Sequence, residues 1–312
     1  PALQEAVASH GLIIREPDGE RVVHPPVATL SAAVDPCDAV LLTVRTYDVA
    51  AAIDDVHRLL AASGKLIAFQ NGVGTEELLA DRLGRNRVIA GTLTASVGQE
   101  KPGEIRRYSR AGGVALAAMD GSRVPGWTVD LFATTGLPTI TVADYRSLRW
   151  SKLLLNMLAA PTSAILDMDI GDLVNDPRVF RIEQRAFREA ARVMDRLGIR
   201  TVALPGYAVP QARLAMRLPR SLAQRLLSRR IARARSGRSP GMRTEMRRGR
   251  LEVDAYNGAI ARAAGRAGVP APVNTALTAL AVDLAEHPER RDELRGRPEK
   301  LARYLASQGV KL

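Results

Sequence analysis

The sequence predicts an α/β domain followed by an all-α domain, and two observations lead to this fold class. Across the first 142 of the 312 residues, short apolar, β-branched runs alternate with segments of helical periodicity, which is typical of βαβ units around a largely parallel sheet. After about residue 144 only helical periodicity remains. We therefore assign residues 1–142 to the first domain and residues 143–312 to the second.

The elements of the first domain follow in a regular order. Strands are expected at residues 12–15, 21–24, 39–45, 65–70, 87–94 and 114–119. Helices are expected at residues 49–62, with Asp48 as N-cap, and at Thr75–Leu83. Two shorter strands, near Glu104 and Thr139, are expected to be antiparallel, because too few residues separate them from their neighbours for a helical crossover.

The second domain is predicted to be a helical bundle. Helices are expected at residues 145–158, 177–197, 243–267, 273–285 and 291–306, and as a pair that breaks at Pro219 in the arginine-rich segment 211–250. No low-complexity linker separates the two halves, so we expect them to pack against each other and leave a cleft. Clefts between domains are favoured sites for ligands.

Composition excludes several classes of protein. With 46% hydrophobic and 25% charged residues, the chain has the composition of a folded soluble protein. Its longest weakly polar stretch, residues 153–166, is shorter than the roughly 20 residues that a membrane span requires. The single cysteine, Cys37, cannot form an intrachain disulfide, and the four histidines lack metal-ligand spacing. We expect a cytoplasmic protein without a metal or a membrane anchor.

The formal net charge of +12 comes from one segment. Residues 211–250 contain thirteen arginines and one acid, Glu245, and 13 − 1 already equals the net charge of the whole chain. Leucines at helical spacing predict a basic amphipathic pair of helices, either with a solvated arginine face or with a face that binds nucleic acid or anionic lipid. No aromatic residue is interleaved for base stacking or membrane anchoring, which favours the solvated face.

Two polar positions follow strands of the predicted sheet. Residues 39–48 read AVLLTVRTYD, which places Arg45 where a strand ends and where ligands bind open α/β sheets. Arg45 is therefore a candidate for contacting a phosphate or ribose, or else it covers a sheet edge. Residues 69–74 read FQNGVG, in which Asn71 and Gly72 form either a plain turn or a close backbone approach to a ligand.

Two helical blocks carry candidate catalytic groups. Residues 150–156 read WSKLLLN and place Lys152 and Asn156 on one helix face. Apolar neighbours would lower the pKa of Lys152 and suit it to donate a proton, unless its side chain extends to solvent. Residues 249–258 read GRLEVDAYNG, with Glu252 and Tyr256 one helical turn apart. Glu252 either pairs with Lys152 across the cleft or is a surface acid.

In this order the four blocks resemble the ketopantoate reductases, the 2-dehydropantoate 2-reductases that use NADPH. The blocks are LLTVRTYD, FQNGVGTEELL, WSKLLLN, and GRLEVDAYNGAI with AGVPAPVNTAL. The resemblance implies a Rossmann-like first domain, a helical domain for substrate binding and dimerisation, and reduction of a 2-keto acid, first of all 2-dehydropantoate in pantothenate biosynthesis. A homodimer is one arrangement that it allows.

The resemblance also implies residue roles. Lys152 would donate the proton to the carbonyl oxygen, and Asn156 would hold the substrate. Asn71 would contact both substrate and cofactor. The NADPH side of the site would be formed by Arg45, Asn71, Gly72, Ala95 and Glu252.

The sequence departs from the family pattern in two places. The glycine-rich G-x-G-x-x-G turn that binds the pyrophosphate is absent, and residues 1–16 resemble the segment after the family's second strand, so we expect an N-terminally truncated Rossmann-like domain with roughly 30 residues missing upstream. Family asparagines are replaced by Ala160 and Ile170, and a serine pair by Pro240 and Gly241. Fewer polar groups favour a less polar 2-keto acid.

Two alternatives to this function remain open at the level of sequence. One is a non-catalytic remnant, or a polyanion-binding module that uses residues 211–250. The other is a related hydroxy-acid dehydrogenase with a different substrate.

Overall fold

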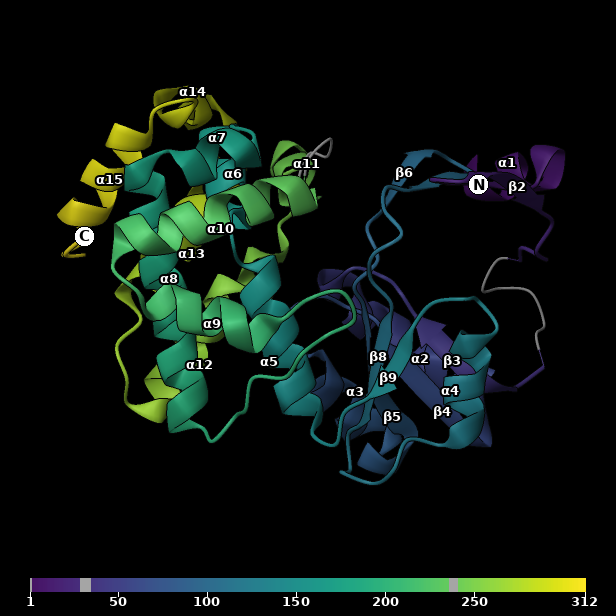
Figure 1. Cartoon of the computed structure of the whole chain (residues 1–312). Helices are drawn as coiled ribbons and strands as arrows, with labels where there is room; N and C mark the ends of the chain where they lie inside the picture. Colours follow the sequence, from purple (N-terminus) through teal and green to yellow (C-terminus); the bar gives the residue numbers. More distant parts are fainter. Residues whose placement is uncertain (1, 29–34, 236–240) are drawn as a thin grey trace.

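The computed structural model describes residues 2–28, 35–235 and 241–312. It has an α/β half and a helical half side by side (Figure 1). Strands end with β9 at Thr141, and from Tyr145 onward the named elements are helices. The predicted α/β class followed by an all-α part is therefore confirmed.

The main sheet of the α/β half has five strands in the order β3-β4-β5-β8-β9. Their bounds are Cys37–Leu42, Leu60–Ala68, Val88–Leu93, Val114–Ala118 and Thr139–Thr141. β3, β4 and β5 are parallel, β8 is antiparallel to β5, and β9 is parallel to β8. The expectation of an antiparallel strand near Thr139 was wrong, because the helix α4 (Gly126–Ala133) lies between β8 and β9 and allows a parallel crossover.

Alternating side chains of the main sheet build two separate cores. On β5 and β8, Ala90 and Ala115 belong to the large core, whereas Ile89 and Leu116 belong to a smaller one on the opposite face. The helices α2 (Val49–Leu59), α3 (Thr75–Leu83) and α5 (Tyr145–Asn156) pack on the strands from the large-core side, and α4 contributes Phe132 to the small core. Because strand side chains alternate between the two faces of the sheet, every second strand residue faces the large core and the helices α2, α3 and α5.

A second sheet stands apart from the first at the upper right of Figure 1. Its strand order is β2-β1-β7-β6, with bounds Gly19–Val23, Leu12–Glu16, Glu104–Arg107 and Val97–Lys101, and the helix α1 (Ala2–His10) precedes it. The strand near Glu104 is antiparallel to β6, as expected, and also parallel to β1. Arg15 joins these strands by ion pairs with Glu20, Glu100 and Glu104 at 2.6–2.8 Å.

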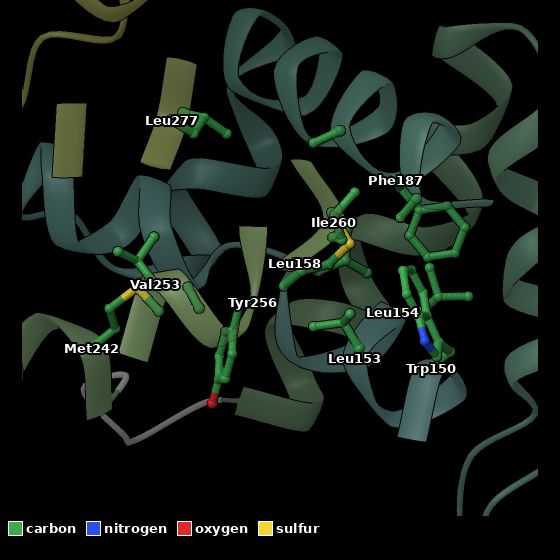
Figure 2. Packing of buried hydrophobic residues seen from close by; sticks show 14 of the residues in the cluster. Trp150, Leu153, Leu154, Leu158, Phe187, Met242, Val253, Tyr256, Ile260 and Leu277 are labelled. Atoms are coloured by element: carbon green, nitrogen blue, oxygen red, sulfur yellow. The ribbon is translucent and has the colours of Figure 1, made fainter. Parts of the chain in front are cut away.

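The helical half is built around α8. The helices after α5 are α6 (Ala160–Leu166), α7 (Ile170–Asn175), α8 (Pro177–Arg196), α9 (Val209–Arg217), α10 (Arg220–Arg235), α11 (Gly241–Arg247), α12 (Asn257–Ala267), α13 (Pro272–Glu286), α14 (Arg291–Leu294) and α15 (Pro298–Ser307). Short 3₁₀ turns are η1 (Thr46–Asp48), η2 (Arg85–Arg87), η3 (Glu252–Ala255) and η4 (Pro288–Arg290). Figure 2 shows Trp150 and Leu154 of α5 packed near Phe187 of α8.

Three predicted helices were too long. The expected helix 243–267 is two helices, because Gly249 takes a left-handed φ of +72° after α11 and η3 follows. The expected helix 291–306 is broken in the same way at Gly296, with a φ of +65°. The helix expected at 49–62 ends at Leu59, where the nine-residue strand β4 begins. Asp48 flanks α2 but its side chain makes no capping hydrogen bond there.

The arginine-rich segment forms the predicted pair of helices with the break at Pro219. Ala223 and Leu227 of α10 are buried against the bundle, whereas four leucines are exposed on α9, α10 and the turn between them: Leu214, Leu218, Leu222 and Leu226. Residues 236–240 lie outside the described part of the chain. Within the described ranges, no helix is long and apolar enough to cross a membrane.

The N-cap of α8 gives a stability prediction. Asp176 accepts hydrogen bonds from the backbone N–H groups of Arg178 (2.8 Å) and Val179 (3.3 Å), and the Arg178 guanidinium holds the pKa of this carboxyl below its usual value. We expect Asp176→Ala to lower the free energy of unfolding by about 1 kcal/mol at neutral pH, as measured by urea denaturation. Because the folded-state pKa is lowered, the difference from wild type should shrink as the pH falls through that pKa.

Asp172→Ala is the matched control, since Asp172 is exposed on the neighbouring α7. An equal loss in the two variants would contradict the capping role of Asp176.

Candidate functional site

The helix α5 carries two of the predicted site residues to the carboxyl edge of the main sheet. Lys152 Nζ donates a hydrogen bond to the carbonyl oxygen of Leu93, at the end of β5, over 3.0 Å. Asn156 Nδ2 donates to Asn71 Oδ1, in the loop after β4, over 2.9 Å. The structure therefore brings Lys152, Asn156 and Asn71 together, although the lysine is 81 positions (152 − 71) beyond Asn71 in the sequence.

Burial of the remaining side chains sets the rotation of α5. Leu153 and Leu154 are fully buried and point into the core (Figure 2), and Lys152 and Asn156 are partly exposed. The N-cap Asp144 accepts hydrogen bonds from the backbone N–H groups of Arg146 and Ser147 and fixes where the helix starts. The lowered pKa expected for Lys152 stays a prediction.

Arg149, which the sequence analysis did not single out, fastens α5 to the sheet. Its side chain is 3% exposed. Nη1 donates to the carbonyl oxygens of Gln70 (2.7 Å) and Gly91 (2.9 Å), and Nη2 donates to that of Ala68 (2.6 Å). The guanidinium thereby binds the ends of β4 and β5 beside the Asn71 loop. The sequence signal that could have identified Arg149 is a charged residue next to the leucine-rich block of α5, three positions before Lys152.

The charge of Arg149 is balanced by Glu76 of α3, with which it forms a fully buried ion pair. Burial raises the pKa of Glu76, and the positive charge of Arg149 opposes that change. Because the pair is inaccessible to solvent, the Glu76 carboxylate depends on the positive charge of Arg149 for its ionised state.

A second polar cluster joins the two halves of the chain. Arg45, three residues beyond the end of β3, places Nη1 at 2.6 Å from Glu245 Oε1 and 2.9 Å from Glu252 Oε2. Glu252 Oε1 also accepts hydrogen bonds from the backbone N–H (3.2 Å) and the hydroxyl (3.1 Å) of Thr46. Glu252 is buried, so the interpretation as a surface acid was wrong, and its partner is Arg45.

The same cluster continues through η1 and η3. Arg250 pairs with Asp48 at 3.2 Å and stacks over the ring of Tyr47 at 4.0 Å. The prediction that Glu252 and Tyr256 share a regular helix was also wrong, because residues 252–255 form the 3₁₀ turn η3. This turn points the Glu252 carboxylate toward β3.

Gly72 allows the Asn71 loop to approach η3. Its φ is +86°, and a Cβ at this position would lie 2.5 Å from the carbonyl oxygen of Ala255. The next residue, Val73, donates its backbone N–H to the same oxygen at 3.3 Å. Glycine is thus required here for contact between the two halves of the chain.

Ala95 lies just beyond the end of β5, next to two hydroxyl groups. Thr94 Oγ1 lies 2.8 Å from the carbonyl oxygen of Pro205 and accepts the backbone N–H of Gly113 at 2.9 Å. Ser96 Oγ is buried and, among the described residues, has no hydrogen-bond partner. This hydroxyl lies three residues beyond Leu93, whose carbonyl oxygen accepts the hydrogen bond of Lys152.

The described residues contain no cluster of three or more side chains that could hold a metal ion. The donors that the site offers are an ammonium group, carboxamides, hydroxyls and a guanidinium. Such donors can bind carboxylate, carbonyl and phosphate oxygens. The site is therefore equipped to bind an anionic organic ligand and to supply a proton to it.

Comparisons with known proteins match both halves of the chain. Residues 1–121 match the sequence profile "Ketopantoate reductase PanE/ApbA", and residues 144–285 match "Ketopantoate reductase PanE/ApbA C terminal". A 2-dehydropantoate 2-reductase of Halobacterium salinarum is 28% identical over 272 residues, which cover 86% of this chain and 82% of the relative.

Solved structures show the same fold. A PanE/ApbA family ketopantoate reductase from Ralstonia eutropha superposes with a TM-score of 0.76 at 24% identity, over 93% of this chain and 89% of that one. A D-mandelate dehydrogenase in complex with NADH and anilino(oxo)acetate gives a TM-score of 0.74 at 19% identity, over 94% and 89%.

These matches define first a class and then a family. The class is the pyridine-nucleotide-dependent oxidoreductases in which an α/β half is followed by a helical half. Within that class, the chain belongs to the ketopantoate reductase family.

The buried pair under α5 gives a second prediction. Arg149→Met would leave the Glu76 carboxylate buried without its counter-ion, and we expect the free energy of unfolding to fall by about 3–5 kcal/mol. Chemical denaturation measures this change.

The double variant Arg149→Met/Glu76→Gln serves as the comparison, since it removes the unpaired charge and should recover part of the loss. The Glu76→Gln single variant completes the cycle. If the losses of the two single variants simply added up in the double variant, the two side chains would not be coupled.

Proposed function

We propose that this chain reduces a 2-keto acid to the corresponding 2-hydroxy acid with NADPH, and that 2-dehydropantoate is the substrate. Family membership supports the reaction class, and one observation carries the assignment of the chemistry. The ammonium group of Lys152 and the amide pair Asn156–Asn71 lie at the carboxyl edge of the main sheet, where α5 crosses from one half of the chain to the other.

In the proposed mechanism Lys152 is the general acid. Bound NADPH would supply hydride to the keto carbon, so negative charge develops on the keto oxygen. A cation beside that oxygen stabilises this charge, and Lys152 Nζ donates the proton that completes the hydroxyl group. The Leu93 carbonyl fixes the direction in which the ammonium group points.

Binding and orientation fall to the polar groups around Lys152. Asn156 and Asn71 would hold the substrate through the two carboxamides that now bind each other. Arg45 and Glu252, with the backbone at Gly72 and Ala95, would face the nucleotide. The Arg45 side chain is about half exposed (47%), so it is accessible to a phosphate or ribose.

A second candidate substrate is a 2-keto acid less polar than 2-dehydropantoate. Ala160 and Ile170 are 6% and 5% exposed and offer no polar side-chain atom. Pro240 lies outside the described residues, and Gly241 has no side chain to contribute. A panel of 2-keto acids of graded polarity, assayed by NADPH oxidation, separates the two candidates by kcat/KM.

Lys152→Ala tests the mechanism. We expect kcat for 2-dehydropantoate reduction to fall by about 100-fold or more, because a positioned general acid contributes a factor of that order. NADPH oxidation followed by absorbance measures the rate, and parallel assays with NADH test the cofactor preference.

Lys101→Ala, the same change at an exposed lysine on β6, should leave kcat unaltered. A Lys152→Ala enzyme that retained half or more of the wild-type kcat would rule out this assignment.

A further inference from the structure

We propose that Glu245 is a positioning residue for the nucleotide, which acts by anchoring Arg45 and Glu252. This inference rests on the proposed function, since it takes both residues to face NADPH. Glu245 lies on α11 in the helical half, and no feature of the sequence other than its place among thirteen arginines marked it.

Each oxygen of Glu245 has a separate task. Oε1 lies 2.6 Å from Arg45 Nη1, and Oε2 accepts the backbone N–H of Glu252 at 3.1 Å. The carboxylate therefore holds the guanidinium on one side and the start of η3 on the other. Through η3 it also fixes the Glu252 carboxylate, which binds the same Nη1 at 2.9 Å.

Both carboxylates use the same nitrogen of Arg45. Among the described residues, none accepts a hydrogen bond from Arg45 Nε or Nη2. A guanidinium that is anchored through one nitrogen and half exposed can present its other N–H groups to phosphate or ribose oxygens with little loss of side-chain entropy. Two buried carboxylates from the helical half thus prepare a cation of the α/β half for an anionic ligand.

Stability alone does not account for this arrangement. Burial raises the pKa of Glu245, the neighbouring Glu252 raises it further, and Arg45 opposes both effects. Replacing the charges of a buried ion pair by uncharged groups of similar shape is often nearly neutral for folding. The trio is therefore expected to matter more for the ligand than for the fold.

Glu245→Gln separates these roles. The amide keeps an oxygen that can accept the Glu252 N–H but loses the charge that anchors Arg45. We expect the dissociation constant of NADPH, measured by isothermal titration calorimetry without substrate, to rise about tenfold. The kcat at saturating NADPH should stay within about twofold of wild type, and the melting temperature should change little.

Two further variants complete the design. Glu245→Asp keeps the charge and should restore part of the affinity. Arg247→Gln, an exposed position on the same helix, should leave NADPH binding unchanged.

A double-mutant cycle tests whether Glu245 affects NADPH binding through Arg45. In an Arg45→Gln background, Glu245→Gln should weaken NADPH binding by much less than tenfold, because the group that it positions is gone. A full tenfold loss in that background, or wild-type affinity of the single variant, would overturn the inference. Failure of the wild-type chain to bind NADPH would instead overturn the proposed function.

Discussion

The geometry of the site depends on the guanidinium of Arg149. It binds the carbonyl oxygens of Ala68, Gln70 and Gly91 and pairs with Glu76, so one buried cation joins α5, α3 and the ends of β4 and β5. Leu93, which accepts the hydrogen bond of Lys152, is two residues beyond Gly91. The same side chain thus holds both α5, which carries the Lys152 ammonium group, and the strand end that this group contacts.

A second set of contacts determines how the helical half meets the sheet. Glu245 and Glu252, both in the helical half, form ion pairs with Arg45 of the α/β half. Gly72 of the α/β half packs against the carbonyl group of Ala255 in η3. These contacts are polar and lie beside the Asn71 loop, whereas the core around α5 and α8 is apolar (Figure 2). The apolar core fixes the position of α5, and the polar contacts join α11 and η3 to the chain that follows β3 and β4.

Local periodicity in the sequence was sufficient for the fold class and for placing Lys152 and Asn156 on one helix face. The resemblance to the ketopantoate reductases, rather than any local pattern, indicated that Asn71 belongs to the same site. The sequence was not sufficient for Arg149 or Glu245. Arg149 contacts the carbonyl oxygen of Gly91, 58 positions away, and Glu245 pairs with Arg45, 200 positions away (245 − 45); no local pattern encodes such partners.

The errors in element boundaries have a similar origin. Residues 243–267 have continuous helical periodicity, and a single glycine in a left-handed conformation, Gly249, divides them. The direction of β9 depended on recognising α4, a short helix of eight residues. In both cases a few residues decided the local geometry against the longer pattern around them.

The leucines exposed on α9 and α10 affect how molecules of this protein behave toward one another. Leu214, Leu222 and Leu226 form an exposed apolar stripe through which two molecules could associate. The arginines of the same segment give every copy a positive charge there, so two copies repel each other. Added salt weakens that repulsion, as the screening length shrinks from about 10 Å at 0.1 M to about 3 Å at 1 M. Low ionic strength should therefore favour dispersed molecules, and concentrated salt should favour clustering through this stripe.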